Sequence, residues 1–91
     1  MNERELQAFV SVATEGRMDE AAKALGYSQP AVSYQIKSLE TTLGTKLFVR
    51  NSTGTTLTQA GMLMLPSAQA VLVLMQGIKN ATASAAARAD R

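Results

Sequence analysis

The fold of this chain is encoded most clearly in residues 18–44, which read MDEAAKALGYSQPAVSYQIKSLETTLG. Apolar residues recur there at helical spacing in two segments, residues 18–25 and residues 29–43. Gly26 is a typical residue to end the first segment, and Ser28 is a typical N-cap for the second. The sequence therefore predicts two short helices joined by a three- to four-residue turn that contains a glycine.

The second of these helices has one apolar face, and a small residue on the first helix lets the two approach closely. The apolar positions are spaced four, three and four residues apart: Val32, Ile36, Leu39 and Leu43. Ala22 keeps the crossing point narrow, and Pro30 falls in the first helical turn, where its missing N–H has no helical partner anyway. This arrangement is typical of a helix-turn-helix.

The opposite face of the second helix carries side chains that can read DNA. In a helix-turn-helix the second helix enters the major groove, and its N-terminal residues lie at the base edges. Here Gln29 can pair with adenine, Ser33 can bond several base edges, and Pro30 can touch a thymine methyl group. The alternative is that this face is simply solvated.

Flanking segments extend the helix pair to a mostly α-helical domain. Residues 3–15 have the apolar periodicity of a first helix. Residues 47–50 and 56–58 read as short strands around a turn rich in Ser, Thr and Gly, which predicts a two-stranded hairpin like the wing of a winged helix. A long last helix is expected to begin after Thr58 and to run into the eighties.

Composition limits the classes of function. The 91-residue chain fits one small domain and has no Cys and no His, which excludes disulfides, Cys/His zinc sites and His-dependent catalytic triads. Its carboxylates are scattered over amphipathic helices, so nothing favours an enzyme, and no cofactor or metal is expected. The net charge of +2 selects no partner, but residues 26–50 alone sum to +2 while residues 1–16 sum to −2.

The residues of these elements also match, in order and without gaps, the pattern of a known family. The matching segments are Leu6–x2–Phe9, Ala21-Ala22–x2–Leu25, Ser28-Gln29-Pro30-Ala31-Val32-Ser33, Gln35-Ile36–x2–Leu39-Glu40, Leu43-Gly44–x2–Leu47-Phe48–x–Arg50 and Leu57-Thr58–x–Ala60-Gly61. The chain thus resembles the N-terminal DNA-binding domain of LysR-type transcriptional regulators. The resemblance is dense to residue 61 and looser to about residue 80.

The resemblance implies a fold, a partner and a setting. It implies a winged helix-turn-helix over residues 1–58 and a linker helix that dimerises over residues 59–91. It also implies a cytoplasmic bacterial transcription factor that binds double-stranded DNA as a homodimer at a pseudo-palindromic operator. A tetramer of the full-length protein stays open. The family's C-terminal effector-binding domain, which would hold any small-molecule effector, is absent from this sequence, so we expect an excised DNA-binding domain.

The family's contact positions fall on the second helix of the pair and on the hairpin. The predicted DNA-binding residues are Ser28, Gln29, Pro30, Ser33, Tyr34, Lys37, Arg50 and Thr53. The resemblance implies that Gln29, Pro30, Ser33 and Tyr34 face bases. It also implies that Arg50 and the wing face the DNA backbone or the minor groove. The alternatives are ordinary surface roles for Lys37 and Lys46, and packing of Arg50 within the domain.

Three departures from the family pattern bear on the contacts. Tyr34 stands where the family often has Arg, so a guanidinium fork is replaced by a phenol that can stack or donate one hydrogen bond. Residues 17–19 read Arg-Met-Asp where Ser-Phe-Thr is usual, which removes the Ser cap and adds an acidic group. The wing turn, residues 51–56, carries no charge, so Thr53 offers only neutral phosphate contacts.

The last helix has apolar residues almost all round its middle, and residues 51–78 carry no charge. A membrane span is disfavoured because the first half of that stretch is polar and Pro66 interrupts the remainder. The widest stripe predicts a dimer interface: Met64, Leu65, Ala68, Val71, Leu72, Met75 and Ile78. The alternative is a helix folded back on its own domain.

A different class of function also fits these residues. A helical interaction module would use the same exposed surface for protein partners. Salt-dependent binding to random DNA separates the two hypotheses, because phosphate contacts release counterions.

Overall fold

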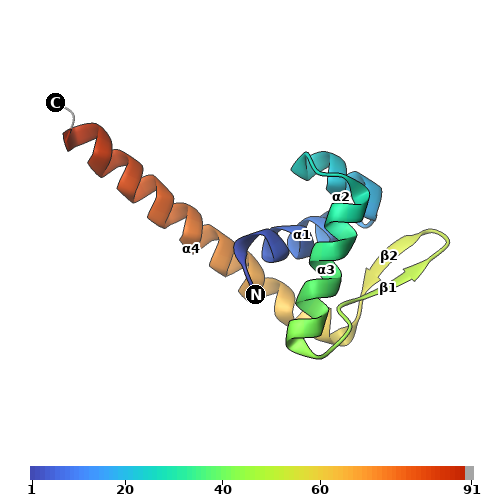
Figure 1. The fold of residues 1–91 in the computed structure, drawn as a ribbon. Coiled ribbons are helices and arrows are strands. Elements are labelled where there is room, and N and C mark those ends of the chain that lie inside the picture. The colour runs from blue at the N-terminus through green and yellow to red at the C-terminus, as the bar shows by residue number, and fades with distance from the viewer. Residues whose placement is uncertain (90–91) are drawn as a thin grey trace.

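The computed structural model describes residues 1–89, in which three helices pack around one small core, a hairpin projects from it, and a long fourth helix runs away from it (Figure 1). The elements in chain order are α1 (Glu3–Glu15), α2 (Met18–Leu25), α3 (Gln29–Leu43), β1 (Phe48–Asn51), β2 (Gly54–Leu57) and α4 (Gln59–Ala89). The predicted fold class, a winged helix-turn-helix followed by a long helix, is confirmed.

Local sequence explains where the helices begin and end. The Asn2 side chain accepts the Glu5 N–H at 2.9 Å, and the Glu5 carboxylate accepts the Asn2 N–H at 2.9 Å, which forms a capping box at the start of α1. The first three helices each end at a glycine in the left-handed region: Gly16, Gly26 and Gly44. These signals lie within a few residues of each helix end, which is why the sequence predicts the bounds of α1 to α3.

The core lies where α1, α2 and α3 meet the base of the hairpin. Its largest fully buried side chains are Phe9, Val12, Val32, Leu39 and Leu47. The Phe9 and Phe48 rings lie 5.4 Å apart between centroids in a tilted arrangement, which joins α1 to β1. The apolar stripe predicted for α3 is buried at Val32, Ile36 and Leu39, whereas Leu43 at the helix end is exposed.

The hairpin corrects the predicted strand bounds. Its turn contains only residues 52 and 53, because the Asn51 side chain accepts both the N–H and the hydroxyl of Thr53 and closes the loop early. Leu47 stays outside β1 because its N–H donates to the Glu40 carboxylate, 2.7 Å away, instead of to a strand. Thr58 stays outside β2 because its hydroxyl caps α4 by accepting the Gly61 N–H. The antiparallel register runs from Phe48 opposite Leu57 to Asn51 opposite Gly54.

The wing is held against the turn between α1 and α2. The Thr55 N–H donates to the Gly16 carbonyl at 2.9 Å. A Cβ at Gly54 would lie 2.7 Å from that same carbonyl oxygen, so only glycine fits this close approach. The hairpin is therefore fixed to the helical unit near its tip as well as at its base.

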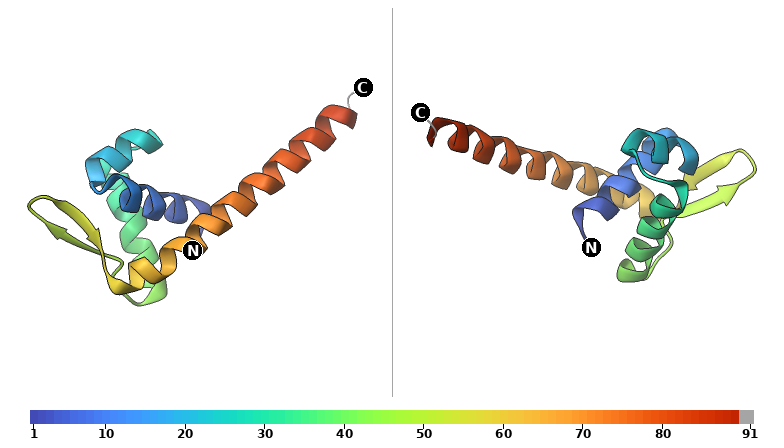
Figure 2. Two further views of the ribbon diagram at one scale, coloured as in Figure 1. Left: turned by 180° about the vertical axis from the view of Figure 1, so that it is seen from behind. Right: turned by 45° about the horizontal axis from the view of Figure 1, so that its top comes forward.

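The helix α4 leaves the compact unit and points away from the wing, in all three views (Figures 1 and 2). Its N-terminal half packs on α1: Ala68 is buried, and Met64, Leu65 and Leu72 lie against the core. Lys79 Nζ lies 2.6 Å from a carboxylate oxygen of Glu3, which ties the helix to the start of α1. Beyond that point α4 is exposed as far as residue 88.

The exposed part of α4 is strongly apolar. By length and composition alone, Gln59–Arg88 contains an 18-residue stretch apolar enough to cross a membrane, with a mean hydropathy of 1.5 and 11% of it buried. Core helices of soluble proteins satisfy the same criterion, so this property is weak support for a membrane. It shows that much of α4 lacks a cover within the described part of the chain.

The buried Glu5 makes the stability of α1 depend on pH. Hydrogen bonds from the Ser38 side chain and the Asn2 backbone, with the N-terminal ammonium nearby, outweigh burial and hold the pKa of Glu5 below its ordinary value of 4.5. A lowered carboxyl pKa stabilises the fold above the ordinary value, and this stabilisation is lost as the pH falls through the folded-state pKa.

We expect Glu5→Gln to keep the capping box but to lower the free energy of unfolding at neutral pH by about 1 kcal/mol, the difference between a hydrogen bond to a charged and to a neutral acceptor. Chemical unfolding of both proteins should show this gap closing as the pH falls below 4.5. A gap that stays constant with pH would assign the effect to packing instead.

Candidate nucleic-acid interface

The first turn of α3 is exposed and held by a cap. The Ser28 hydroxyl accepts the Ala31 N–H at 3.3 Å, and Pro30 lies in the first turn. Ser28, Gln29 and Pro30 are all exposed, as a surface that reads base edges requires. The Ser28 hydroxyl already accepts the cap hydrogen bond, so its proton and one further lone pair are left for a DNA contact.

One and two turns further along, the side chains of α3 differ in how far they are exposed to an outside partner. The side chain of Tyr34 is 69% exposed, and Lys37 is exposed on the same helix. Ser33 is half-buried and faces the hairpin. The helix therefore offers a phenol and an ammonium group to an outside partner, and one hydroxyl that is shared with the wing.

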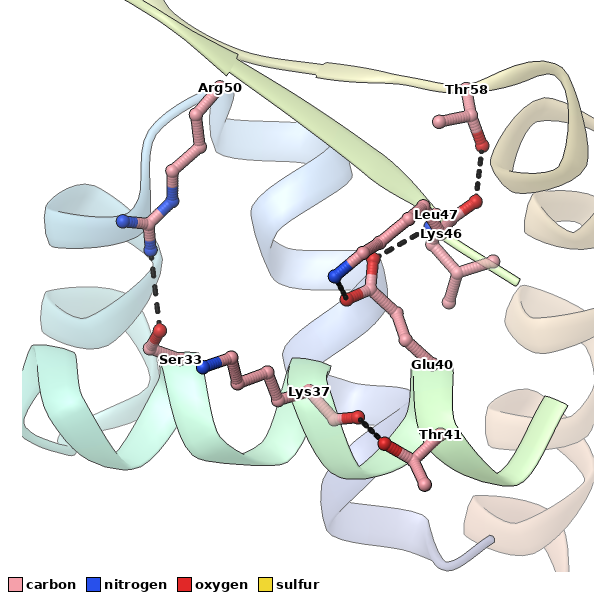
Figure 3. Close-up of polar contacts among 8 residues, drawn as sticks. All are labelled: Ser33, Lys37, Glu40, Thr41, Lys46, Leu47, Arg50 and Thr58. Atoms are coloured by element: carbon pink, nitrogen blue, oxygen red, sulfur yellow. Dashed lines mark hydrogen bonds and ion pairs between the residues drawn. The ribbon is translucent and has the colours of Figure 1, made fainter. Parts of the chain in front are cut away.

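Arg50 joins the wing to this helix (Figure 3). Its Nη2 donates to Ser33 Oγ at 3.3 Å, across 17 residues of sequence. The guanidinium is exposed and makes only this one side-chain hydrogen bond among the described residues, so most of its donors remain free. Arg50 thus orients the wing and still presents positive charge beside α3.

A groove of about 480 Å³ runs between α3 and β1, and it is bordered by cations. Lys37, Lys46 and Arg50 all line it. Glu40 lies at its far end, where its carboxylate accepts the Leu47 N–H and lies 3.8 Å from Lys46 Nζ (Figure 3). The carboxylate is committed to the backbone of the chain, so the groove as a whole favours an anionic partner.

Five of the eight predicted contact residues line two adjoining hollows. A cleft of about 280 Å³ is lined by Gln29, Arg50 and Thr53, and the neighbouring groove by Ser33, Lys37 and Arg50. Arg50 lines both, so the two hollows adjoin. Ser28, Pro30 and Tyr34 line neither and stand on the exposed side of α3.

The structure adds a cation that the sequence prediction missed. Arg17 lines the first cleft together with Gln29 and the wing turn. No local pattern could identify it, because its position depends on the contact between the α1–α2 turn and the wing. Lys46, which the sequence left undecided, lies in the second groove.

The predicted dimer residues divide between two faces of α4. Ala68 is buried in its own domain, and Met64, Leu65 and Leu72 are half-buried against that core. Met75 is half-buried, whereas Val71 and Ile78 are exposed. Other exposed apolar residues lie outside the predicted set: Met62, Leu63, Val73 and Leu74. Part of the predicted stripe therefore faces α1 of the same chain.

The fold and this surface define a winged helix-turn-helix protein. A family model described as the bacterial regulatory helix-turn-helix protein, lysR family, matches residues 4–62. The chain belongs to this LysR family, and its winged helix-turn-helix is the DNA-binding domain of a bacterial transcriptional regulator.

Curated relatives support this assignment. The chain is 49% identical over 74 residues to the HTH-type transcriptional regulator BudR of Klebsiella aerogenes, which covers 81% of this chain and 52% of that protein. It is 39% identical over 90 residues to the HTH-type transcriptional regulator ClcR of Pseudomonas putida, covering 99% and 30%. The chain spans about half or less of the length of these relatives.

Solved structures of such domains are close to this fold. The crystal structure of the CbnR_DBD–DNA complex matches with a TM-score of 0.86 at 38% identity, over 94% of this chain and 99% of that one. The crystal structure of the BenM_DBD/catB site 1 DNA complex matches with a TM-score of 0.88 at 32% identity, over 94% and 97%.

Proposed function

We propose that this chain binds double-stranded DNA with sequence specificity, as a homodimer on a pseudo-palindromic operator. The observation that carries the proposal is the exposed first turn of α3 beside a wing that Arg50 fastens to the same helix. The solved DNA complexes of similar domains support it. The match to a family of bacterial regulators supports a cytoplasmic regulator without catalytic activity.

The contacts fall into two kinds. Gln29, Pro30 and Tyr34 are exposed on α3 and would read base edges in the major groove. The cations Lys37 and Arg50 would bind phosphates along the groove between α3 and β1. Thr53 would make at most a weak backbone contact, because its hydroxyl already donates to Asn51.

The proposed division of labour follows the packing. Residues 1–58 would form the DNA-reading unit, and residues 59–91 the linker and dimerisation helix. A small-molecule effector, as the family resemblance implies, would bind in a part of the full-length protein outside these segments.

A base-reading role for Gln29 can be tested directly. We expect Gln29→Ala to cost about 1–3 kcal/mol at one base pair of the operator and to relax the preference there. The operator would first be selected from a random DNA pool, and affinities for its single-base variants would then be measured by fluorescence polarisation.

Gln35 is the matched control because it lies on the same helix but is half-buried, whereas Gln29 is exposed. Gln35→Ala should leave the base preferences unchanged. If Gln29→Ala also leaves every preference intact, Gln29 does not read a base.

The dimer interface that we propose is a single seam along α4. Its residues are spaced by four, three, four, three and four, the spacing of a coiled-coil seam: Ser67, Val71, Leu74, Ile78, Ala81 and Ala85. Val71, Leu74 and Ile78 are 40%, 68% and 65% exposed. The seam keeps two predicted dimer residues and replaces those that face α1.

The seam continues into an apolar hollow on the compact unit. Met1, Leu6, Leu43 and Val71 line a cleft of about 190 Å³ between α1, α3 and α4. We propose that a second copy covers both, because the same surface on two subunits satisfies a twofold axis. Burying the seam would remove from water the side chains that make α4 so apolar.

The interaction module remains as the second candidate, and it would use the same exposed surface that we assign to DNA for protein partners. Fluorescence polarisation with random DNA at two salt concentrations separates the two functions. Binding that weakens steeply with salt supports the DNA-binding function, and no salt-dependent binding supports the protein partner.

A further inference from the structure

Arg17 occupies a junction between the helix-turn-helix and the wing. It directly follows Gly16, whose carbonyl accepts the Thr55 N–H from β2. It is also the N-cap residue of α2, where its side chain makes no capping hydrogen bond. The side chain is therefore free of a helix-capping role and lies beside the wing.

The cleft around Arg17 joins the parts of the proposed DNA surface. Gln29 from α3, Arg50 from β1 and the wing turn line this cleft together with Arg17 and Asp19. The wing turn and β2 contribute no cation, since residues 51–58 are uncharged. Among the residues that line this cleft, Arg17 and Arg50 thus supply the positive charge.

In the free chain, Arg17 is paired with Asp19. Its Nε and Nη2 lie 3.1 and 3.4 Å from the two carboxylate oxygens of Asp19. The pairing raises the pKa of Arg17 and lowers the pKa of Asp19, mainly through this hydrogen bond. Both side chains are well exposed, at 61% and 41%, and exposed pairs of this kind exchange readily for other partners.

We propose that Arg17 binds a DNA backbone phosphate beside the wing, and that Asp19 competes with the phosphate for the Arg17 guanidinium. A phosphate can accept the same two-pronged hydrogen bond that the carboxylate accepts. When DNA approaches, Arg17 exchanges Asp19 for the phosphate, and Asp19 remains as a negative charge that opposes binding. This inference rests on the proposed DNA-binding function.

The salt dependence of DNA binding tests Arg17. We expect Arg17→Gln to weaken binding to all sequences alike and to reduce the salt slope by about one phosphate contact. The affinity ratio between 50 and 200 mM salt should then shrink by about 3.5-fold, which follows from a slope of about 0.9 per contact. Fluorescence polarisation with the selected operator and with random DNA measures both effects.

Lys23 supplies a matched control. It is a cation on the same helix with an acidic partner, Glu20, at 3.6 Å, but it lines neither DNA-side hollow. Lys23→Gln removes the same charge and should change affinity and slope much less. Equal effects of the two variants would show general electrostatic attraction and would overturn the Arg17 contact.

Asp19 is tested in the opposite direction. Asp19→Asn should strengthen binding several-fold, whereas Glu20→Gln, the partner of the control lysine, should change it little. An unchanged affinity of Asp19→Asn would overturn the competition. If the unmodified chain binds no DNA in a salt-dependent way, the proposed function itself fails; if it binds and Arg17→Gln matches Lys23→Gln, only this inference fails.

Discussion

Replacing Leu74 with aspartate is expected to convert the dimer into a folded monomer. Leu74 is 68% exposed in the single chain and lies in the middle of the proposed seam, so the substitution removes no contact with its own core. In the dimer it would bury a carboxylate without a partner, and an unpaired buried ion costs several kcal/mol. The twofold axis places two such charges in one interface.

We expect the dissociation constant of the dimer to rise by more than about a hundredfold, since each 1.4 kcal/mol is a factor of ten. Sedimentation equilibrium measures the mass, and circular dichroism shows whether the helices persist. Operator affinity should fall with the dimer, because each monomer then reads only one half-site. The measurement needs no detergent if α4 is covered by a second copy rather than by lipid.

Val73→Asp is the matched control for the seam. Val73 is 70% exposed on the same helix but lies about 100° round it from Leu74. The Val73→Asp substitution should therefore weaken the dimer far less than Leu74→Asp does. Equal weakening by both variants would place the interface on a broader face than the seam, and a wild-type monomer at tens of micromolar would remove the dimer altogether.

A second large effect is expected from Gly61→Ala. Gly61 lies in the first turn of α4, where a Cβ would collide with the Leu47 carbonyl oxygen and would lie 2.8 Å from a methyl group of Leu57. A backbone oxygen cannot rotate away as a side chain can, so α4 and β1 would have to separate. We expect the free energy of unfolding to fall by about 3 kcal/mol. This loss is at or above the upper end of the usual cost of adding a carbon atom to a well-packed core.

Gly77 offers the matched control within the same helix. A Cβ there would meet nothing within 4 Å, so Gly77→Ala should stabilise the chain by up to about 1 kcal/mol through helix propensity. Both variants are best made in the Leu74→Asp background, where unfolding does not depend on dimerisation. Chemical denaturation gives the two free energies, and similar values for the two alanines would contradict the collision at Gly61.

The helices could be predicted because their signals are local. Caps, glycine stops and apolar periodicity lie within a few residues of each other, as Asn2 and Gly16 show for α1. The predicted bounds of the two strands were wrong because two side chains, those of Glu40 and Thr58, accept backbone N–H groups at the ends of the hairpin. Leu47 and Thr58 share one backbone hydrogen bond, from the Thr58 N–H to the Leu47 carbonyl. The Leu47 N–H donates to Glu40 and the Thr58 hydroxyl caps α4, so the ladder is not continued through this pair.

The candidate site was predictable where one helix supplies it. The spacing on α3 identifies Gln29 and Tyr34 as exposed, and both are. Arg17 was missed because its place in the proposed DNA surface depends on the wing. The hydrogen bond from the Thr55 N–H to the Gly16 carbonyl brings the wing beside it. The sequence also could not show which face of α4 meets α1, because the middle of this helix is apolar nearly all round. The ion pair of Glu3 with Lys79, which lies at this contact, joins residues 76 positions apart in the chain.

The packing of its base on α1 makes α4 a spacer of defined direction. With its base packed on α1 and Lys79 held by Glu3, the helix cannot swing freely, so the alignment of two α4 helices fixes the separation of their reading units. Sliding that alignment by seven residues would move the units by about 10 Å, or about three base-pair steps. Substitutions in α4 could therefore change the operator spacing that the protein accepts while every residue that touches DNA stays the same.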